Sequence, residues 1–360
     1  MARFLRPARR AGTAAATRRW PRSFADRLTA PLPGPAQFLR LLREGGFSGG
    51  NRGTGSAEAP QSFESTESTE STESTGNTAR IPVAARAPLP SDADWLVWLG
   101  HASFLLRLGG RTVAVDPVLS ERILGAGRRL TPPGLDRLPP LDLLLISHNH
   151  YDHLDAPTVR ALPRDTRVVA PGGLGRWFRR RGFTDVTELD WWESADLAPA
   201  AGADGGLGVT FVPAHHWSRR GVFDHCASLW GGWVLTATDG TRLYHAGDSG
   251  YGHFFTEIGA RYPGIDIAML PVGAYAPRWF MRPVHVDPEE AVQAAQDAGA
   301  RTLVPMHWGT FRLSREPVLE PIERTRAAWA ATGRDPADLW ELAVGESRVL
   351  GGEVARDDSS

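Results

Sequence analysis

Four side chains of metal-binding type stand close together where one apolar segment ends. The strand-type run Leu141–Ile146 leads into His148, His150, Asp152 and His153. His148 and His150 are two residues apart, so their imidazoles lie on the same side of an extended chain. Asp152 and His153 follow where the chain turns and can address a second point, so the motif suits two metal ions better than one. The alternative is a His-rich surface loop that binds metal adventitiously, which is disfavoured because the motif follows a buried-type strand.

Four other apolar runs end in a side chain of similar chemistry. Asp116 follows Thr112–Val115, His216 follows Val209–Val212, Asp248 follows Leu243–Ala246 and His307 follows Thr302–Met306. Because sites in α/β sheets gather at the carboxyl ends of strands, we expect these side chains to converge on one cleft. Between the last two runs, Asp287, Pro288 and Glu290 predict the capped start of a helix, and Gly299 predicts its stop.

Zinc is the metal that this set of side chains favours. It binds histidine nitrogen and carboxylate oxygen at about 2.0–2.2 Å, and catalytic zinc sites keep one position open for water. Two ions about 3.5–4 Å apart make that water a nucleophile near neutral pH. We therefore predict a hydrolytic centre with two Zn2+ ions as cofactors. The sequence contains no Ser nucleophile elbow, phosphate-binding glycine loop or nucleic-acid motif that competes seriously with it.

The chain is predicted to consist of an arm, one catalytic domain and a short tail. Residues 64–75 are four Glu-Ser-Thr repeats without an apolar face, which is typical of a disordered linker. Before them, Pro35–Gly46 has the pattern of a short amphipathic helix that packs on the domain or on something else. We place the basic arm at 1–79, the domain at 80–352 and the tail at 353–360.

The charge and the cysteine content of the chain restrict its classes of partner and its cellular compartment. The net charge of -1 creates no overall field that attracts nucleic acid, although the first 25 residues contain seven arginines and no acid. We interpret that start as a solvated tail in preference to an organelle transit peptide. Cys226 is the only cysteine, so no intramolecular disulfide points to an oxidising compartment. We expect a cytoplasmic protein, with peripheral membrane contact and a homodimer left open.

A family resemblance rests on several of these segments together. Residues 148–153, with Trp98–Ser103, Asp116-Pro117 and Ala246–Asp248, resemble the metallo-β-lactamase superfamily. Within it, the chain looks most like the N-acylphosphatidylethanolamine-hydrolysing phospholipase D family, over roughly Trp95–Phe311. The resemblance implies an α/β fold, the αββα sandwich, with the metals at one edge of its two sheets.

The resemblance also implies which side chains hold each metal. One zinc ion would take His148, His150 and His216, the other would take Asp152, His153 and His307, and Asp248 would bridge the two. His215 is set aside because adjacent side chains at a strand end point opposite ways and because the pair His216-Trp217 matches the family. Asp116 is predicted to accept a hydrogen bond from a ligating imidazole or to cap a turn. His101 is predicted to be a structural turn histidine.

Asp248 and His285 are the predicted catalytic residues. His285 precedes the helix capped by Asp287, where free N–H groups favour an anion. The resemblance implies a role for His285 toward the substrate phosphate or as an acid, against the alternative of simple packing. In the segment Gly273–Met281, Arg278 is a candidate cation for a phosphodiester. The family also suggests that four aromatic side chains line an acyl-chain groove, namely Trp217, Trp279, Phe280 and Trp308.

The implied activity is that of a zinc-dependent phosphodiesterase of phospholipase D type. It would hydrolyse N-acylphosphatidylethanolamine or a related phospholipid to phosphatidic acid and an N-acylethanolamine. The enzymatic alternative is a hydrolase of a small soluble substrate, such as a sugar-phosphate lactone or a cyclic phosphodiester, since a fold does not settle a substrate. A non-catalytic metal-binding scaffold is a third alternative, against which the intact ligand set argues.

Overall fold

The computed structural model describes most of the chain from residue 81 onward and parts of the N-terminal arm. The described residues are 9–10, 18–29, 32–46, 81–85, 88–124, 126–130, 138–198 and 206–351. The Glu-Ser-Thr repeats at 64–75 and the tail at 353–360 lie outside them. The division of the chain at residues 80 and 352 therefore stays a prediction.

Two seven-stranded sheets face each other. The first sheet has the order β16 (Ser347–Val349), β2 (Trp95–Gly100), β3 (Ser103–Leu108), β4 (Arg111–Val115), β7 (Leu143–Leu145), β8 (Arg167–Pro171) and β9 (Val186–Leu189). The second has the order β1 (Arg9–Arg10), β10 (Glu193–Leu197), β11 (Leu207–Val212), β12 (Gly232–Ala237), β13 (Arg242–His245), β14 (Ile267–Pro271) and β15 (Thr302–Met306). Strands β5 (Arg122–Ile123) and β6 (Ala126–Gly127) form a separate hairpin.

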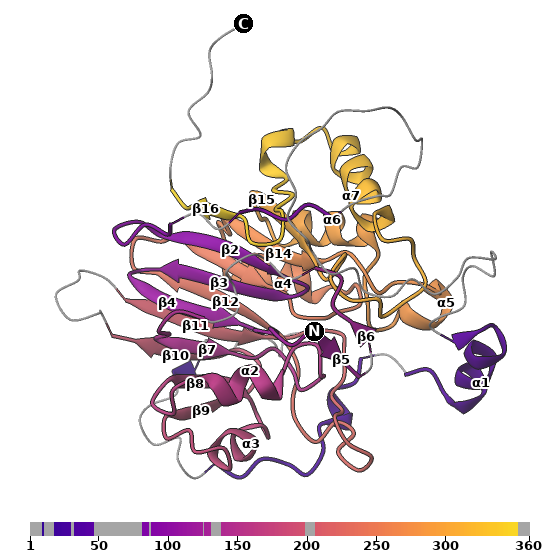
Figure 1. Cartoon of the computed structure of the whole chain (residues 1–360), viewed down its shortest axis with the longest axis horizontal. Helices are drawn as coiled ribbons and strands as arrows, with labels where there is room; N and C mark the ends of the chain where they lie inside the picture. The colour runs from indigo at the N-terminus through magenta and orange to yellow at the C-terminus, as the bar shows by residue number, and fades with distance from the viewer. Residues whose placement is uncertain are drawn as a thin grey trace, which may run out of the picture.

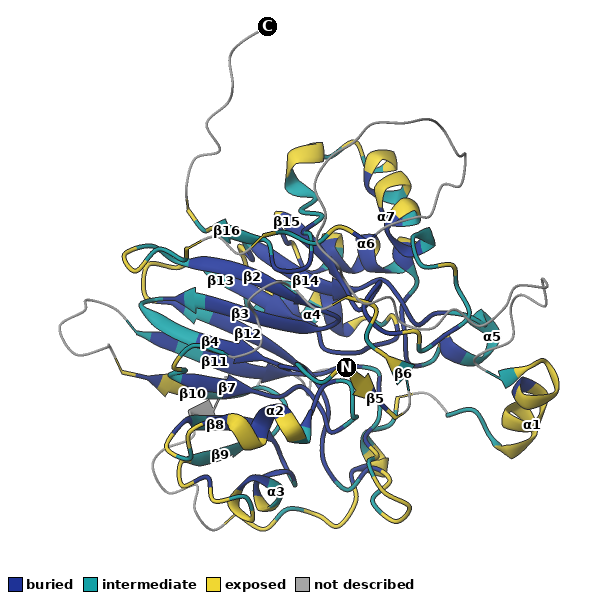
Figure 2. Cartoon of the chain, viewed as in Figure 1, coloured by how far each residue is buried: buried dark blue, intermediate teal, exposed yellow. Residues whose placement is uncertain are grey.

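Helices cover the outer face of each sheet (Figure 1). Helices α2 (Ala156–Ala161) and α3 (Gly175–Arg179) bury apolar side chains against the first sheet. Helix α6 (Pro288–Asp297) packs on β14 and β15, between α4 (Phe254–Arg261) and α7 (Glu320–Ala331). The space between the sheets holds the largest apolar core, and the strands are mostly buried (Figure 2). The predicted αββα sandwich is confirmed.

The apolar runs predicted as strands are strands, with bounds that differ by a few residues at most. Every residue of β2, β14 and β15 is buried. Both faces of these strands are covered, which explains continuous apolar runs in place of alternation. The capped helix is also confirmed, because the Asp287 side chain accepts from the Glu290 N–H and Gly299 adopts a φ of 65° after α6.

The direction of the strands brings several of their carboxyl ends to one edge. Strands β4, β7, β8 and β9 run parallel in the first sheet. Strands β13, β14 and β15 run parallel in the second. Parallel neighbours end on the same side. The side chains that follow β4 and β7 therefore meet those that follow β13 and β15.

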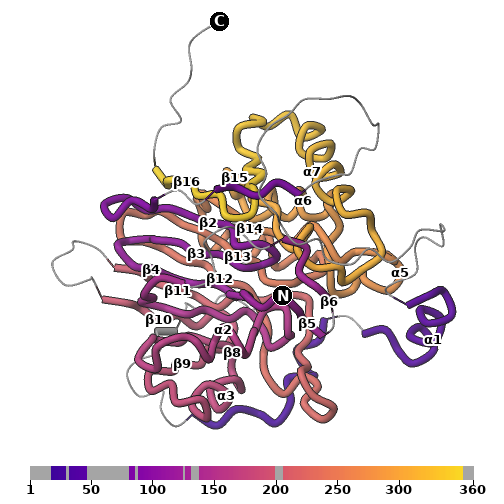
Figure 3. The backbone as a smooth tube through the Cα atoms, in the orientation of Figure 1, coloured from indigo at the N-terminus to yellow at the C-terminus, as the bar shows by residue number. Residues whose placement is uncertain are grey.

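Part of the N-terminal arm lies against the domain. The Phe24 side chain is buried, and its N–H donates to the Cys226 carbonyl at 2.7 Å. Arg18 forms an ion pair with Glu193 at 2.6 Å. Beyond Phe24 comes a 3-10 turn, Ala25–Arg27. Figure 3 shows this indigo segment along the lower edge of the molecule, whereas α1 (Pro35–Arg43) lies to the right.

Helix α1 is the amphipathic helix predicted at Pro35–Gly46, and it packs on the domain by a narrow contact. Its only buried side chain is that of Leu41. The Arg315 guanidinium donates to the carbonyls of Leu41 at 3.1 Å and Gly46 at 2.6 Å. In the described part of the chain, no helix is long and apolar enough to cross a membrane.

Candidate metal centre

The backbone turns sharply at the strand ends that carry the predicted ligands and their neighbours. His101 after β2, Asp116 after β4 and His307 after β15 have positive φ angles of 55°, 44° and 65°. Such angles are uncommon for residues other than glycine and concentrate at functional sites. Gly247 precedes Asp248, and a Cβ atom at Gly247 would lie 2.7 Å from the Gly231 oxygen. Only glycine fits there.

Three predicted ligands form a first group. His148 Nε2 lies 2.9 Å from His150 Nδ1, and His216 Nε2 lies 3.1 Å from the same atom. The strands β7 and β11 bring these three imidazoles together although His216 is more than sixty residues away in the sequence. These three nitrogens therefore point to a common centre, which is the arrangement that a bound cation requires.

Asp152, His153 and His307 form a second group, and Asp248 lies between the two groups. Asp152 Oδ2 is 3.7 Å from His153 Nε2 and 3.6 Å from His307 Nε2. The two oxygens of Asp248 lie 3.1 Å from the same nitrogens, Oδ2 facing His153 and Oδ1 facing His307. Asp248 Oδ2 is also 3.9 Å from Nε2 of both His148 and His216. We call these seven residues the His/Asp cluster.

The cluster has the chemistry of a metal site. Among the described residues, His153 Nε2, His307 Nε2 and Asp248 Oδ1 are buried and make no hydrogen bond, in spite of their short separations. Buried polar atoms normally have a partner, since an unpaired one costs about 1–3 kcal/mol. A cation between them would satisfy all three atoms at once, and the donors are of the nitrogen and carboxylate type that zinc binds.

The pKa values fit this interpretation. Burial lowers the pKa of His148 well below its ordinary value, that of His150 to about 3 and that of His216 to about 4. Their imidazoles are neutral at pH 7, which is the form that binds metals. Burial would also lower the pKa of His307, but Asp248 and Asp152 raise it to about 9. The second group thus holds charge pairs whose protons a divalent cation can displace.

Asp116 and His101 orient members of the second group. Asp116 Oδ2 accepts from His153 Nδ1 at 2.8 Å, so the predicted hydrogen bond to an imidazole is confirmed. His101 Nε2 lies 3.0 Å from Asp152 Oδ2, and the His101 ring centroid is 3.9 Å from that of His307. His101 does stand in a turn, as predicted, but it also contacts two cluster residues. Such contacts to ligands fix their orientation.

His216 and His215 point in different directions. The His216 ring lies in the cluster, with Nδ1 fixed by the Val284 carbonyl at 3.0 Å. The His215 ring packs on Phe254 at a centroid distance of 4.8 Å, and its Nδ1 faces the Tyr251 carbonyl at 3.2 Å. The structure therefore brings His216 to the other predicted ligands and leaves His215 outside.

Arg220 is a positioning residue that the sequence analysis missed. Its Nη1 donates to the carbonyls of Asn149 at 3.1 Å and Leu154 at 2.6 Å, on both sides of the ligands His150 and Asp152. Its guanidinium carbon lies 4.0 Å from the Tyr151 ring centroid. No local sequence pattern predicts these contacts, because Arg220 is about seventy residues away from the ligand loop in the sequence. Arg220 holds the ligand loop in its bent form.

Replacing Arg220 by Lys is expected to weaken metal binding without unfolding the protein. Lysine keeps the charge, but it lacks the planar fork that bonds the carbonyls and stacks on the ring. We expect zinc affinity to fall about 10–100-fold, the range typical for residues that orient ligands. Competition with a chromogenic chelator measures the affinity, and Arg219→Lys, an exposed neighbour, is the matched control. Equal affinity in the two variants would contradict the positioning role.

His285 lies beside the cluster, and Arg278 holds it there. Ligand atoms of His285, His216 and Asp248 lie within 4.8 Å of one another. Arg278 donates to the His285 carbonyl at 2.5 Å and pairs with Asp287 at 3.1 Å. Arg278 was a candidate cation for the substrate. The structure corrects this interpretation, because Asp287 and Glu290 both engage its guanidinium.

A cleft opens above the cluster. One cavity of about 630 Å³ is lined by His150, His216, His285, Trp217, Phe280 and Phe38 of α1, among others. A second of about 520 Å³ shares His150, Trp217 and His285 with it and reaches Asp152, Asp248 and His307. Of the four predicted lining aromatics, Trp217 and Phe280 line these cavities. Trp279 packs under Arg40 of α1, and Trp308 is buried against Trp98.

Comparison with known proteins places this fold and site in a superfamily. A family model described as "Beta-lactamase superfamily domain" matches residues 111–308. An uncharacterized protein of Mycobacterium tuberculosis is 40% identical over 265 residues, which cover 69% of this chain and 68% of that protein. The metallo hydrolase Igni18 of Ignicoccus hospitalis has a similar structure, with a TM-score of 0.53 and 25% identity over 72% of this chain and all of that one.

The chain belongs to the metallo-β-lactamase superfamily and is a metal-dependent hydrolase with a His/Asp cluster able to bind metal. Within that superfamily it is similar to N-acyl-phosphatidylethanolamine-hydrolyzing phospholipase D 1 of Caenorhabditis elegans. The two are 36% identical over 245 residues, which cover 64% of this chain and 68% of that protein. The resemblance found in the sequence is confirmed at both levels.

Proposed function

We propose that the chain is a binuclear zinc phosphodiesterase of phospholipase D type. The observation that carries the proposal is the pair of ligand groups that share Asp248, under a cleft with apolar walls. His148, His150 and His216 would hold one zinc ion, Asp152, His153 and His307 the other, and Asp248 would bridge them. The similarity to the Caenorhabditis elegans enzyme supports N-acylphosphatidylethanolamine, or a related phospholipid, as the substrate.

Bound zinc would supply positive charge for the phosphoryl oxygens and an activated water for attack on phosphorus. The bond from phosphorus to the ethanolamine oxygen breaks, so phosphatidic acid and an N-acylethanolamine leave, the latter with the proton. The chain's own side chains position the phosphodiester. Because burial holds the pKa of His285 well below its ordinary value, its imidazole is neutral at pH 7 and binds a phosphoryl oxygen as an N–H donor.

The cleft walls favour a substrate with long apolar chains. Trp217, Phe280, Met281 and Val284 line the larger cavity together with Phe38 of α1. Polar groups gather at its base, where His150, His216 and His285 lie. A small polar metabolite would need polar contacts along the walls as well. We also propose a cytoplasmic location with peripheral contact to the membrane that holds the substrate.

Replacing His285 by Ala is expected to retain both zinc ions but to lower lipid turnover by about 100–1,000-fold, the usual loss for one oxyanion donor. The measurement is release of N-acylethanolamine from mixed micelles, with zinc content determined on the same sample. His253→Ala, an exposed histidine at the start of α4, is the control and should match wild type.

The substrate class is tested with the same wild-type protein. We expect long-chain N-acylphosphatidylethanolamine to be cleaved faster than a soluble phosphodiester. Robust hydrolysis of a lactone or a cyclic phosphodiester, with no detectable lipid cleavage, would replace the phospholipid with a small soluble substrate. Loss of zinc in His285→Ala would instead make His285 a ligand.

A further inference from the structure

Exposed apolar side chains are concentrated on three segments of the molecule. Among the described residues, nine large apolar side chains are exposed, and six of them belong to these segments. Phe223 is fully exposed and Leu124 is 78% exposed. The six residues are Phe38, Leu39 and Leu42 of α1, Leu124 in the turn between β5 and β6, and Val222 and Phe223 in the loop after Arg219. We call them the docking rim.

The docking rim borders the cleft. Phe38 lines the cavity of about 630 Å³, and Leu124 lines the adjoining cavity of about 520 Å³. Gly221, directly before Val222, lines the latter. Arg219 lines both cavities, so the two form one cleft. Three segments that are far apart in the sequence therefore place apolar side chains where the route to the His/Asp cluster begins.

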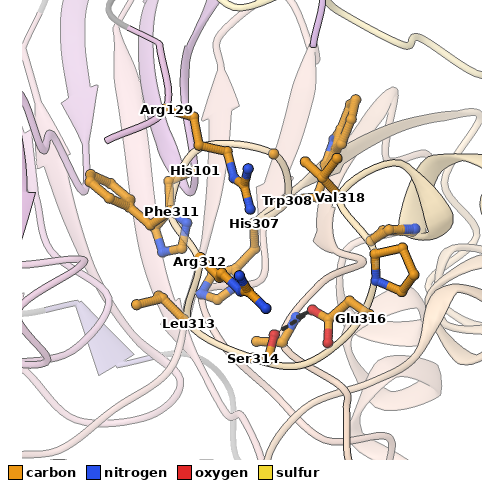
Figure 4. Close-up of a pocket in the computed structure, with 14 residues that line it drawn as sticks. His101, Arg129, His307, Trp308, Phe311, Arg312, Leu313, Ser314, Glu316 and Val318 are labelled. Atoms are coloured by element: carbon orange, nitrogen blue, oxygen red, sulfur yellow. Dashed lines mark hydrogen bonds between the residues drawn. The ribbon is translucent and has the colours of Figure 1, made fainter. Parts of the chain in front are cut away.

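Positive charge accompanies these apolar side chains. Five exposed arginines on or beside these segments form no ion pair with a carboxylate in the described part of the chain, namely Arg43, Arg122, Arg129, Arg219 and Arg312. Arg129 and Arg312 extend into a small pocket that His101 and His307 also line (Figure 4). Leu313 lines both this pocket and the cavity of about 520 Å³. The pocket therefore adjoins the cleft.

We propose that the docking rim binds the surface of an anionic phospholipid bilayer. The proposal rests on the proposed phospholipid substrate and names the surface that gives access to it. A group of exposed apolar side chains indicates an interaction site. Apolar side chains flanked by arginines match the boundary between headgroups and acyl chains, where each arginine near an anionic surface contributes about fivefold in affinity. A second copy of the chain would gain nothing from the unpaired positive charges on both partners.

Docking in this way places the cleft directly on the lipid. Helix α1 is a wall of the cleft through Phe38 and presents Leu39 and Leu42, each about half exposed, away from its buried Leu41. When these side chains enter the bilayer, a phospholipid reaches the cleft without passing through water. The headgroup then meets His285 and the His/Asp cluster while the acyl chains stay among apolar side chains.

The test is vesicle binding by the full-length, zinc-loaded protein. It uses sedimentation with vesicles of phosphatidylcholine alone and of phosphatidylcholine with phosphatidylglycerol. The variant with Leu39→Ser, Leu42→Ser and Phe223→Ser removes apolar surface without touching the cleft lining. We expect its affinity for the mixed vesicles to fall at least about 100-fold. Val349→Ser, which changes an exposed apolar residue on β16, is the control and should bind as wild type does.

A second variant tests the charge. Arg43→Gln with Arg122→Gln, which line none of these cavities, should weaken binding to the mixed vesicles by about 25-fold and leave binding to phosphatidylcholine unchanged. Unchanged vesicle binding by the triple-serine variant would overturn the proposal. So would a wild-type dimer that this variant converts to monomer, since the rim would then join two copies. Turnover of a soluble phosphodiester should stay at the wild-type rate in both variants. Vesicle binding by a wild type that cleaves no phospholipid would count against the proposed function alone.

Discussion

Replacing Asp248 by Asn is expected to remove most of the metal from both groups together and to lower phosphodiester turnover at least about 1,000-fold. Asp248 is the one carboxylate within 4 Å of nitrogens in both ligand groups among the described residues. Asparagine has nearly the same shape, but it carries no charge and presents one acceptor where Asp248 presents two. The buried imidazoles would then face a cation without the negative charge that offsets it.

Elemental analysis of zinc-loaded protein after gel filtration measures this effect. We expect about two ions per wild-type chain and far fewer in Asp248→Asn. Asp297→Asn, on α6 and outside the cluster, should bind as wild type does. A single tightly bound ion in wild type that survives in Asp248→Asn would contradict the binuclear centre.

The strands, and the edge of the sheets at which the His/Asp cluster lies, could be predicted from the sequence because one physical rule governs both. A strand buried on both faces is a continuous apolar run, and its end is marked by the first polar side chain. The run before His307 has this form, so both the strand and the position of its ligand followed from local sequence. Ser147 stands between the run and His148, and β13 ends in His245 before Asp248, so there the ligand is not the first polar side chain. These strand ends meet in space because the strands pair in parallel. The motifs do not specify that pairing, which is seen in the fold.

Contacts between distant segments could not be predicted in this way. Arg278, at the start of the short helix α5 (Arg278–Met281), was interpreted as a cation for the substrate, but Asp287 and Glu290 engage it in the fold. Phe24 lies in the basic arm, outside the predicted domain, and yet it is buried. Arg220 binds backbone carbonyls, which have no signature in the sequence. Local patterns describe what a residue is, whereas these roles depend on which residues the fold brings near.

Several residues outside the ligand set hold the predicted ligands in position. His153 is held by Asp116, His216 by the Val284 carbonyl and Asp152 by His101. In His153 and His216 this contact occupies one ring nitrogen and leaves the other directed at the centre of the cluster, whereas Asp152 turns the same oxygen, Oδ2, toward His101, His153 and His307. Supporting contacts of this kind keep the ligand atoms converged before a cation binds, which lowers the cost of assembling the site.

Replacing the adjacent residues His215 and His216 by Ala, one at a time, is expected to give opposite results for metal binding. His216→Ala is expected to lose most of the metal from the first ligand group, with at least about 1,000-fold lower turnover, because two imidazoles remain where three converged. His215→Ala is expected to keep its metal and to retain activity within a fewfold. Its ring packs on Phe254 and against Gly252, and its Nδ1 faces the Tyr251 carbonyl. The two substitutions are chemically identical and one residue apart, so each serves as the control for the other.

Zinc content and phosphodiester turnover are measured on both variants, with circular dichroism to establish that each is folded. Since neighbouring side chains at the end of β11 point to opposite sides, only one of the two can reach the cluster. The structure places Nε2 of His216 3.1 Å from His150 and fixes its other nitrogen on the Val284 carbonyl. If His215→Ala lost the metal while His216→Ala kept it, the ligand set of the first group would be wrong, but Asp248 and the second group would be unaffected by that result.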